Sequence, residues 1–171
     1  AALTGHLVLS TMHTNDAATA LPRLIDMKIE PFLAASTINV VVAQRLVRRI
    51  CEKCRVTYIP DDAELKLLAL DNDKKVKGGK LKKGGARRNT VLYRGAGCKV
   101  CGHTGYAGRV GIFEILEVTE NIQNLTMRRA SSEEIEKAAS AAGMRTMFED
   151  GVRKIFEGAT TVEEILRATR E

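Results

Sequence analysis

The sequence contains no tryptophan, and phenylalanine and tyrosine together make up only 4% of its 171 residues. No apolar run approaches the roughly 20 residues that a helix needs to cross a bilayer. No secretory signal segment is present. These features favour a protein that is neither membrane-spanning nor exported. We therefore expect a globular protein of the cytoplasm with reduced cysteines.

The chain also does not begin with methionine, and Ala1–Gly5 has the character of the end of an earlier element. We expect the sequence to be a piece of a larger protein. Its length still allows a substantial hydrophobic core, either in one domain or in a domain with a small appendage.

The net charge of +6 is typical of proteins that bind nucleic acid or anionic membranes. Its distribution weakens that interpretation, because most of the excess cations fall in one glycine-rich run, and without that run the remainder is close to neutral. We expect a solvated loop there, over residues 72–90. The run contains Lys74, Lys75, Lys77, Lys80, Lys82, Lys83, Arg87 and Arg88.

All four cysteines lie in two Cys-x-x-Cys knuckles, at Cys51 and Cys54 and at Cys98 and Cys101. Two such turns can direct four thiolates to one tetrahedral ion, the arrangement that zinc favours. The long interval between the knuckles costs little loop-closure entropy. A filled four-thiolate site leaves no open position for water, so we predict a structural zinc ion.

Other interpretations of the cysteines remain open. Disulfides would require an oxidising compartment. A redox-active Cys-x-x-Cys normally occurs once, at the start of a helix. Four unconnected buried thiols are also possible, and His103 could either replace one thiolate or pack against the knuckle.

The apolar pattern predicts a mixed α/β chain. His6–Thr11 has the pattern of a buried strand, residues 17–25 of a helix interrupted by Pro22, and Phe32–Ile50 of a long helix closed by arginines. Asp61–Glu64 and Ser131–Glu134 are capping boxes that open further helices. Strands are expected over 91–94 and 109–117, and helices from Thr119, from Met147 to Phe156 and from Thr160 to the end.

His6 and His13 bracket the first predicted strand. Their α-carbons would be on the order of 20 Å apart if the run is extended, so they could not share one metal ion. Ligands of open α/β sheets bind beyond the carboxyl ends of strands. That end would be occupied by Thr11, His13, Thr14 and Asn15, which could orient a phosphate. The alternative is a histidine in an ordinary turn.

Several motifs resemble the ATPases of type II secretion and type IV pilus assembly. Thr4–Ala17 is similar to the family's His box, and Ala43–Cys51 to the segment that leads into its zinc knuckle. Gly97–Glu114 is similar to the second knuckle and the strand that leaves it. Gly143–Met147, with the later Asp150 and Gly151, resembles the carboxy-terminal helices.

The resemblance implies the carboxy-terminal part of a RecA-like P-loop ATPase sheet, with an inserted four-cysteine zinc module and a helical bundle at the end. The expected domains are residues 1–50 (ATPase core), 51–108 (zinc module) and 109–171 (exit strand and helical subdomain). His6, Thr11 and His13 are the His-box candidates for the nucleotide-responsive face, and Arg45 is a candidate for nucleotide contact.

The family's phosphate loop and acidic Walker B strand are absent from this sequence. Without the loop, no backbone nest and no lysine hold the phosphates, and without the acid Mg²⁺ has no anchor. We expect no ATP hydrolysis by this chain alone. The resemblance implies a parent that is a homo-hexameric ATPase using ATP and Mg²⁺, peripheral to the inner membrane and bound to a membrane platform protein. The alternative is a zinc-ribbon module that binds nucleic acid or serves as a scaffold.

Overall fold

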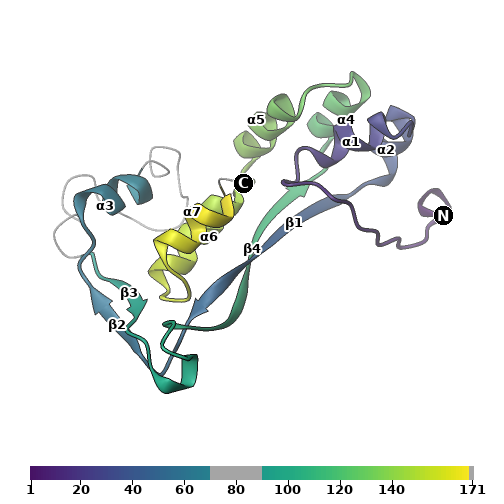
Figure 1. Cartoon of the computed structure of the whole chain (residues 1–171). Helices are drawn as coiled ribbons and strands as arrows, with labels where there is room; N and C mark the ends of the chain where they lie inside the picture. Colours follow the sequence, from purple (N-terminus) through teal and green to yellow (C-terminus); the bar gives the residue numbers. More distant parts are fainter. Residues whose placement is uncertain (70–89, 170–171) are drawn as a thin grey trace. The chain divides into compact units, whose positions relative to one another are not determined.

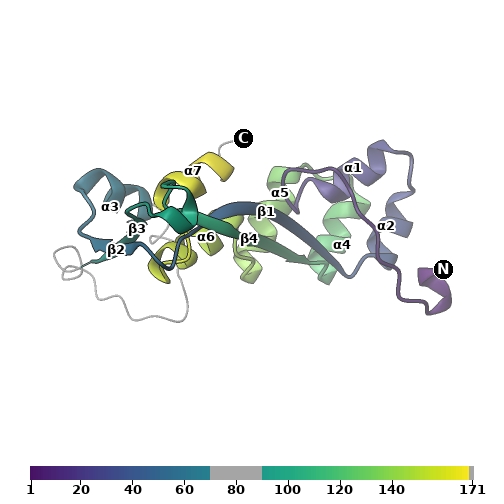
Figure 2. The same ribbon diagram turned by 60° about the horizontal axis from the view of Figure 1, so that its bottom comes forward.

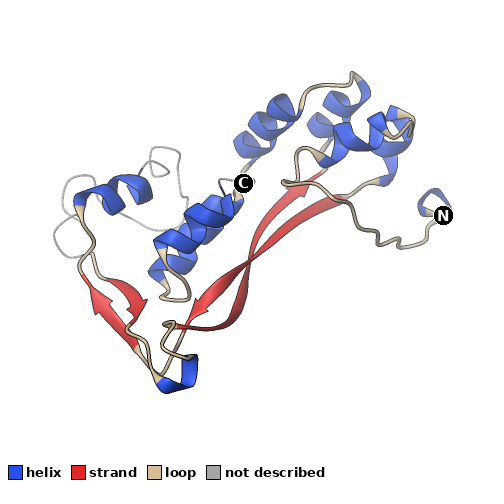
Figure 3. Cartoon of the chain, viewed as in Figure 1, coloured by secondary structure: helices blue, strands red, loops and turns tan. Residues whose placement is uncertain are grey.

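The computed structural model describes residues 1–69 and 90–169, and it is a mixed α/β chain with two small two-stranded sheets (Figures 1 and 3). The helices and strands follow in the order α1 (Ala20–Asp26), α2 (Pro31–Thr37), β1 (Val40–Ile50), β2 (Arg55–Tyr58), α3 (Asp62–Ala69), β3 (Leu92–Gly95), β4 (Tyr106–Glu117), α4 (Glu120–Met127), α5 (Ser132–Ala142), α6 (Met147–Phe156) and α7 (Val162–Thr169). Within residues 1–69 and 90–169, two short 3₁₀ turns, η1 (Ala2–Thr4) and η3 (Lys99–Cys101), complete the order.

The predicted helix over Phe32–Ile50 is wrong. The helix α2 ends at Thr37, and an eleven-residue strand, β1, runs from Val40 to Ile50. Three consecutive valines begin this strand, and β-branched side chains lose rotamer freedom in a helix but pack well on a pleated sheet. The arginines at the end of this segment therefore close a strand and not a helix.

The predicted buried strand over His6–Thr11 is also wrong. The segment has no regular structure, and Leu7 and Leu9 are 86% and 88% exposed. A buried strand needs neighbours that pair with its backbone. Within the described residues, the sheets consist of β1 with β4 and β2 with β3, so no strand is paired with this segment.

Pro22 does not break the first helix. The helix α1 begins only at Ala20, which places Pro22 in its first turn, where a missing N–H costs no helical hydrogen bond. An acidic side chain orders the turn that precedes α1. Asp16 accepts from the Thr19 backbone N–H at 2.7 Å, just before the helix.

The other predicted elements agree with the structure. Both capping boxes form, with Asp61 accepting from the Glu64 N–H and Ser131 from the Glu134 N–H. Gly143 ends α5 in a left-handed conformation. The strand expected over 109–117 is β4, and its inner phase is buried at Ile112, Glu114 and Leu116.

The chain divides into two compact units. The first comprises Ala1–Gln44 and Phe113–Met147, and the second comprises Arg45–Ile112 and Phe148–Glu171. In the first unit, α2 packs against both α1 and α4, and α4 packs against α5 (Figures 1 and 2). In the second unit, β2 and β3 pair antiparallel, with Arg55 opposite Gly95 and Tyr58 opposite Leu92.

The expected basic loop lies almost wholly outside the described residues. Of the helices that are described, none combines the length and apolar character that a membrane span requires.

Candidate metal centre

Each cysteine pair occupies a tight turn beside a strand of the second unit. Cys51 directly follows β1 and Cys54 directly precedes β2, whereas Cys98 and Cys101 lie at the two ends of the turn that contains η3. The Cys54 N–H donates to the Cys51 carbonyl at 3.2 Å, and the Cys101 N–H donates to the Cys98 carbonyl at the same distance. The two knuckles therefore share one backbone turn.

The four sulfurs gather in one cluster, all within 4.8 Å of one another. The Sγ–Sγ distances are 3.7 Å for Cys98–Cys101, 3.8 Å for Cys54–Cys101 and 3.9 Å for Cys51–Cys98. A disulfide requires about 2.05 Å, so these are free thiols. Four sulfurs placed about 2.3 Å from one tetrahedral ion would lie about 3.8 Å apart. The observed spacing fits a metal site of this kind.

Backbone donors favour the thiolate form of Cys101. The N–H groups of Cys98 and Gly105 point at its Sγ at 3.2 and 3.3 Å. These hydrogen bonds, with the Cys98 N–H first, lower the pKa of Cys101 to about 6. Desolvation, together with hydrogen bonds to the other sulfurs, raises the pKa of Cys54 to about 12. Without a metal, the cluster therefore cannot readily hold four thiolates, and a cation would supply the missing charge.

Backbone contacts hold the two knuckles together. The Cys51 N–H donates to the Gly105 carbonyl, and the Ala96 N–H donates to the Cys54 carbonyl, both at 2.9 Å. Gly95 lies so close to Gly105 that a Cβ at Gly95 would be 2.0 Å from the Gly105 carbonyl oxygen. Only glycine permits this approach, so the pair fixes how the second knuckle lies against the end of β3.

His103 is not one of the clustered residues, which are the four cysteines within the described part of the chain. It has a left-handed backbone, with φ of 61°, and its N–H donates to the Cys98 carbonyl at 2.8 Å. Its side chain is exposed. His103 therefore contributes to the turn through its backbone N–H.

The end of β1, just before the first knuckle, is tied to the last helix by a buried carboxylate. Glu164 of α7 is 1% exposed and accepts from the Arg48 backbone N–H at 2.9 Å and its guanidinium at 2.7 Å. Arg167 donates to the same carboxylate at 2.9 Å. Burial alone would raise the pKa of Glu164, but the bonds from these arginines lower it to about 2. The carboxylate is thus charged at neutral pH.

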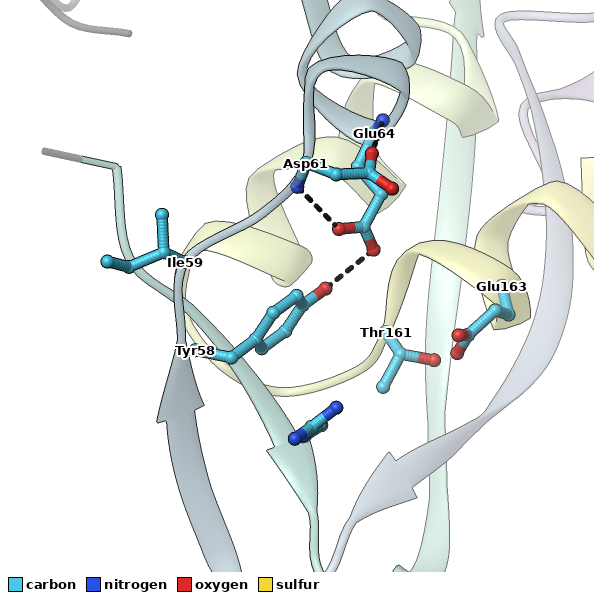
Figure 4. A pocket seen from close by; sticks show the side chains of 7 residues that line it. Tyr58, Ile59, Asp61, Glu64, Thr161 and Glu163 are labelled. Carbon is cyan, nitrogen blue, oxygen red and sulfur yellow. Dashed lines mark hydrogen bonds between the residues drawn. The ribbon is translucent and has the colours of Figure 1, made fainter. Parts of the chain in front are cut away.

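A polar cavity of about 320 Å³ lies beside β2 in the second unit (Figure 4). Tyr58 and Glu64 point toward one another, and the phenol donates to the carboxylate at 2.8 Å. Burial, followed by this hydrogen bond, raises the pKa of Tyr58. The guanidinium of Arg94 lies 5.4 Å from the centre of the Tyr58 ring. The remaining lining residues are Ile59, Asp61, Thr161 and Glu163.

None of the predicted His-box residues lines this cavity. His6 Nδ1 lies 3.0 Å from the Thr4 hydroxyl, and the side chains of His6, Thr11 and His13 are exposed. Arg45, the predicted nucleotide contact, donates to the backbone carbonyl of Ala168 in α7. Their roles toward a nucleotide stay predictions.

Two buried carboxylates that matter to the structure were not among the predicted residues. Glu164 and Glu114 each lie on the buried face of their helix or strand, and the other residues on that face are apolar or small. For Glu114 the sequence carries a usable signal, because it falls between Ile112 and Leu116 in a strand of period two. Nothing in the sequence identifies the distant backbone groups to which these carboxylates bind.

Comparison with known proteins gives a consistent answer. The family model described as "Type II/IV secretion system protein" matches residues 1–167. The chain is 44% identical over 171 residues to the type IV pilus assembly ATPase PilB of Thermus thermophilus. The alignment covers 100% of this chain and 18% of that protein.

Two further relatives are secretion proteins. The type II secretion system protein HxcR of Pseudomonas aeruginosa is 44% identical, with 30% of its length covered, and the type II secretion system ATPase E of Vibrio cholerae is 42% identical, with 31% covered. Both alignments cover 100% of this chain, which thus spans less than a third of the length of these relatives. The chain belongs to the family of type II/IV secretion system proteins.

Proposed function

We propose that this chain is the carboxy-terminal part of an ATPase that powers assembly of a type II secretion pseudopilus or a type IV pilus, and that Cys51, Cys54, Cys98 and Cys101 hold one structural zinc ion. The four-sulfur cluster is the observation that carries the zinc proposal. The ATPase role is supported by the relatives, which include a type IV pilus assembly ATPase and a type II secretion system ATPase.

Zinc would act here by cross-linking two distant parts of the chain. Thiolates are strong zinc ligands, and a site filled by four of them has no position for water or substrate. The N–H groups aimed at the Cys101 sulfur would hold that ligand in place, as supporting hydrogen bonds do in metal sites. The metal would therefore stiffen the module between β1 and β4.

The parent protein would work as a homo-hexamer that uses ATP and Mg²⁺ and sits at the cytoplasmic face of the inner membrane, bound to a membrane platform protein. Residues 1–50 would belong to its RecA-like core, 51–108 to the zinc module, and 109–171 to the exit strand and helical bundle. His6, Thr11, His13 and Arg45 stay candidates for the nucleotide-responsive face.

Metal analysis tests the zinc proposal. We expect one zinc per chain in the purified protein and a marked loss in both Cys51→Ser and Cys98→Ser, because each knuckle supplies half of the ligands. Lys99→Ser, inside the second knuckle but without a ligand, is the matched control and should retain the metal. Undiminished zinc in either cysteine variant would contradict a shared site.

Turnover measurements test the ATPase role of this part. The sequence lacks a phosphate loop, so we expect this chain alone to show negligible ATP hydrolysis. Magnesium-dependent hydrolysis that persists through purification would contradict that expectation. Binding to duplex DNA that weakens steeply with salt would instead favour the nucleic-acid alternative.

A further inference from the structure

Glu114 of β4 is a buried carboxylate that the proposed zinc site does not use. Its side chain lies on the inner phase of the strand and is 5% exposed. An ionised carboxylate in such a place needs donors that compensate for the loss of water. No ion pair of Glu114 with a described cation is seen, so its compensation comes from backbone groups.

The two carboxylate oxygens bind two backbone segments that are distant in sequence. Oε1 accepts from the Ala17 N–H at 2.9 Å, and Oε2 accepts from the Met147 N–H at 3.3 Å. Ala17 lies in the turn that leads into α1, and its side chain is fully buried. Met147 is the first residue of α6, where N–H groups have no partner within the helix. One side chain thus satisfies donors on two elements.

The two donors lie at the boundaries of structural elements: Ala17 just before α1, and Met147 at the end of the first unit. Ala17, Glu114 and Met147 all belong to the first unit, and Met147 is the last residue before the chain passes into the second unit. Ala17 follows directly on the segment that contains His13 and Asp16. Asp16 orders the same turn, since it accepts from the Thr19 N–H at 2.7 Å.

We propose that Glu114 is a coupling residue, whose shared carboxylate makes the backbone at Ala17 and the backbone at Met147 depend on one another. A displacement of the chain before α1 would pull on one oxygen and disturb the other bond. If the proposed ATPase role is right, this link would carry a change at His13 to Met147, the residue at which α6 begins. The coupling itself requires no nucleotide and can be measured in this chain alone.

The electrostatic surroundings make the link sensitive to protonation. Burial raises the pKa of Glu114, the two N–H bonds oppose that shift, and the charges of Asp16 before α1 and Glu136 on α5 raise the pKa further. Protonation removes the negative charge that strengthens both hydrogen bonds, and it turns one of the two oxygens into an O–H donor. Both bonds should therefore weaken over the same pH range.

Amide hydrogen exchange measured by NMR tests the coupling through a double-mutant cycle. Asp16→Ala loosens the turn at Ala17, and in the otherwise unchanged protein we expect exchange at the Met147 amide to accelerate about tenfold, a factor typical of losing one hydrogen bond. In a Glu114→Gln background, Met147 exchange should already be fast, and Asp16→Ala should add little. Asp26→Ala, at the exposed end of α1, and Glu117→Gln, on the outer phase of β4, are the matched controls.

A titration of the unchanged protein avoids any risk that a variant fails to fold. The amide shifts of Ala17 and Met147 should follow one transition, with the same midpoint, above the ordinary pKa of glutamate. The proposal is overturned if the two amides titrate separately or not at all, or if Asp16→Ala affects Met147 equally with and without Glu114. None of these outcomes depends on whether the parent hydrolyses ATP.

Discussion

The two cysteine knuckles and the leading segment, residues 1–16, both carry side chains that bind metals or phosphates in proteins, yet they differ in how the chain holds them. The knuckle sulfurs converge within 4.8 Å and their turns are tied by backbone bonds. In the leading segment, His6 and His13 are exposed and the intervening apolar residues contact solvent. Ligand convergence in this chain therefore depends on paired strands behind the turns, which the leading segment lacks among the described residues.

The largest expected effect is the loss of stability when the metal is removed, because only the knuckles, and not the leading segment, should respond. If zinc holds the knuckles, stripping it with a chelator removes binding free energy that acts as folding free energy, about 10 kcal/mol for structural zinc sites in small domains. We expect the thermal midpoint to fall markedly and exchange to rise around Cys51 and Cys98. Amides of residues 6–14 should not change. An unchanged midpoint would show that the strands alone hold the knuckles.

Glycine substitutions test the same contrast without touching a ligand. Gly95→Ala would put a Cβ 2.0 Å from backbone, so we expect a loss of stability above about 3 kcal/mol in denaturant unfolding, together with weaker zinc retention. Gly5→Ala, in the leading segment, meets no atom within 4 Å and should cost only about 1 kcal/mol because of its φ of 86°. Equal costs would contradict the close approach at Gly95.

The charge of Glu164 gives a pH-dependent test of how β1 is held. Its pKa is about 2 in the folded chain and about 4.3 when unfolded, so its stabilisation is complete above about pH 5 and is lost as the pH falls toward 2. We expect Glu164→Gln to cost about 2 kcal/mol at pH 6, with the difference from the unchanged protein shrinking at pH 3. Glu163→Gln, its exposed neighbour, is the control. A difference that is independent of pH would rule out the charge as the cause.

The smallest expected effect is a gain in stability. Lys28 and Arg129 each follow a helix in a left-handed conformation, with φ of 70° and 55°, where glycine has no steric penalty. Lys28→Gly and Arg129→Gly should each stabilise the chain by about 0.5–1 kcal/mol, measured by urea unfolding. Lys28→Ala removes the same charge but keeps the strain, so it should give no such gain.

The predictability of this chain follows the range of the interactions involved. The two capping boxes and the strand β4 depend on neighbours within a few residues, and both predictions agree with the structure. The cysteine cluster is the exception: each knuckle is local, but the two knuckles lie 47 residues apart, and their meeting was predicted from the need of one metal ion for four ligands.

The failures have the opposite character. The run from Val40 to Ile50 could satisfy a helical or an extended pattern, and its pairing with β4, more than 50 residues away, decides for the strand. The segment His6–Thr11 has the composition of a buried strand, but composition does not supply a partner. Glu114 and Glu164 bind backbone groups 97 and 116 residues away, which no local pattern specifies.

The register of β2 with β3 has a practical consequence. Tyr58 pairs with Leu92 and Arg55 pairs with Gly95. The paired strands β2 and β3 therefore lie between the two knuckles and the interval of residues 59–91 along the chain. The distance between the sulfurs is thus set independently of how many residues that interval contains. A reporter domain or an affinity tag could therefore be inserted in this interval. The insertion would be attached to the metal module and would leave the four cysteine ligands unchanged.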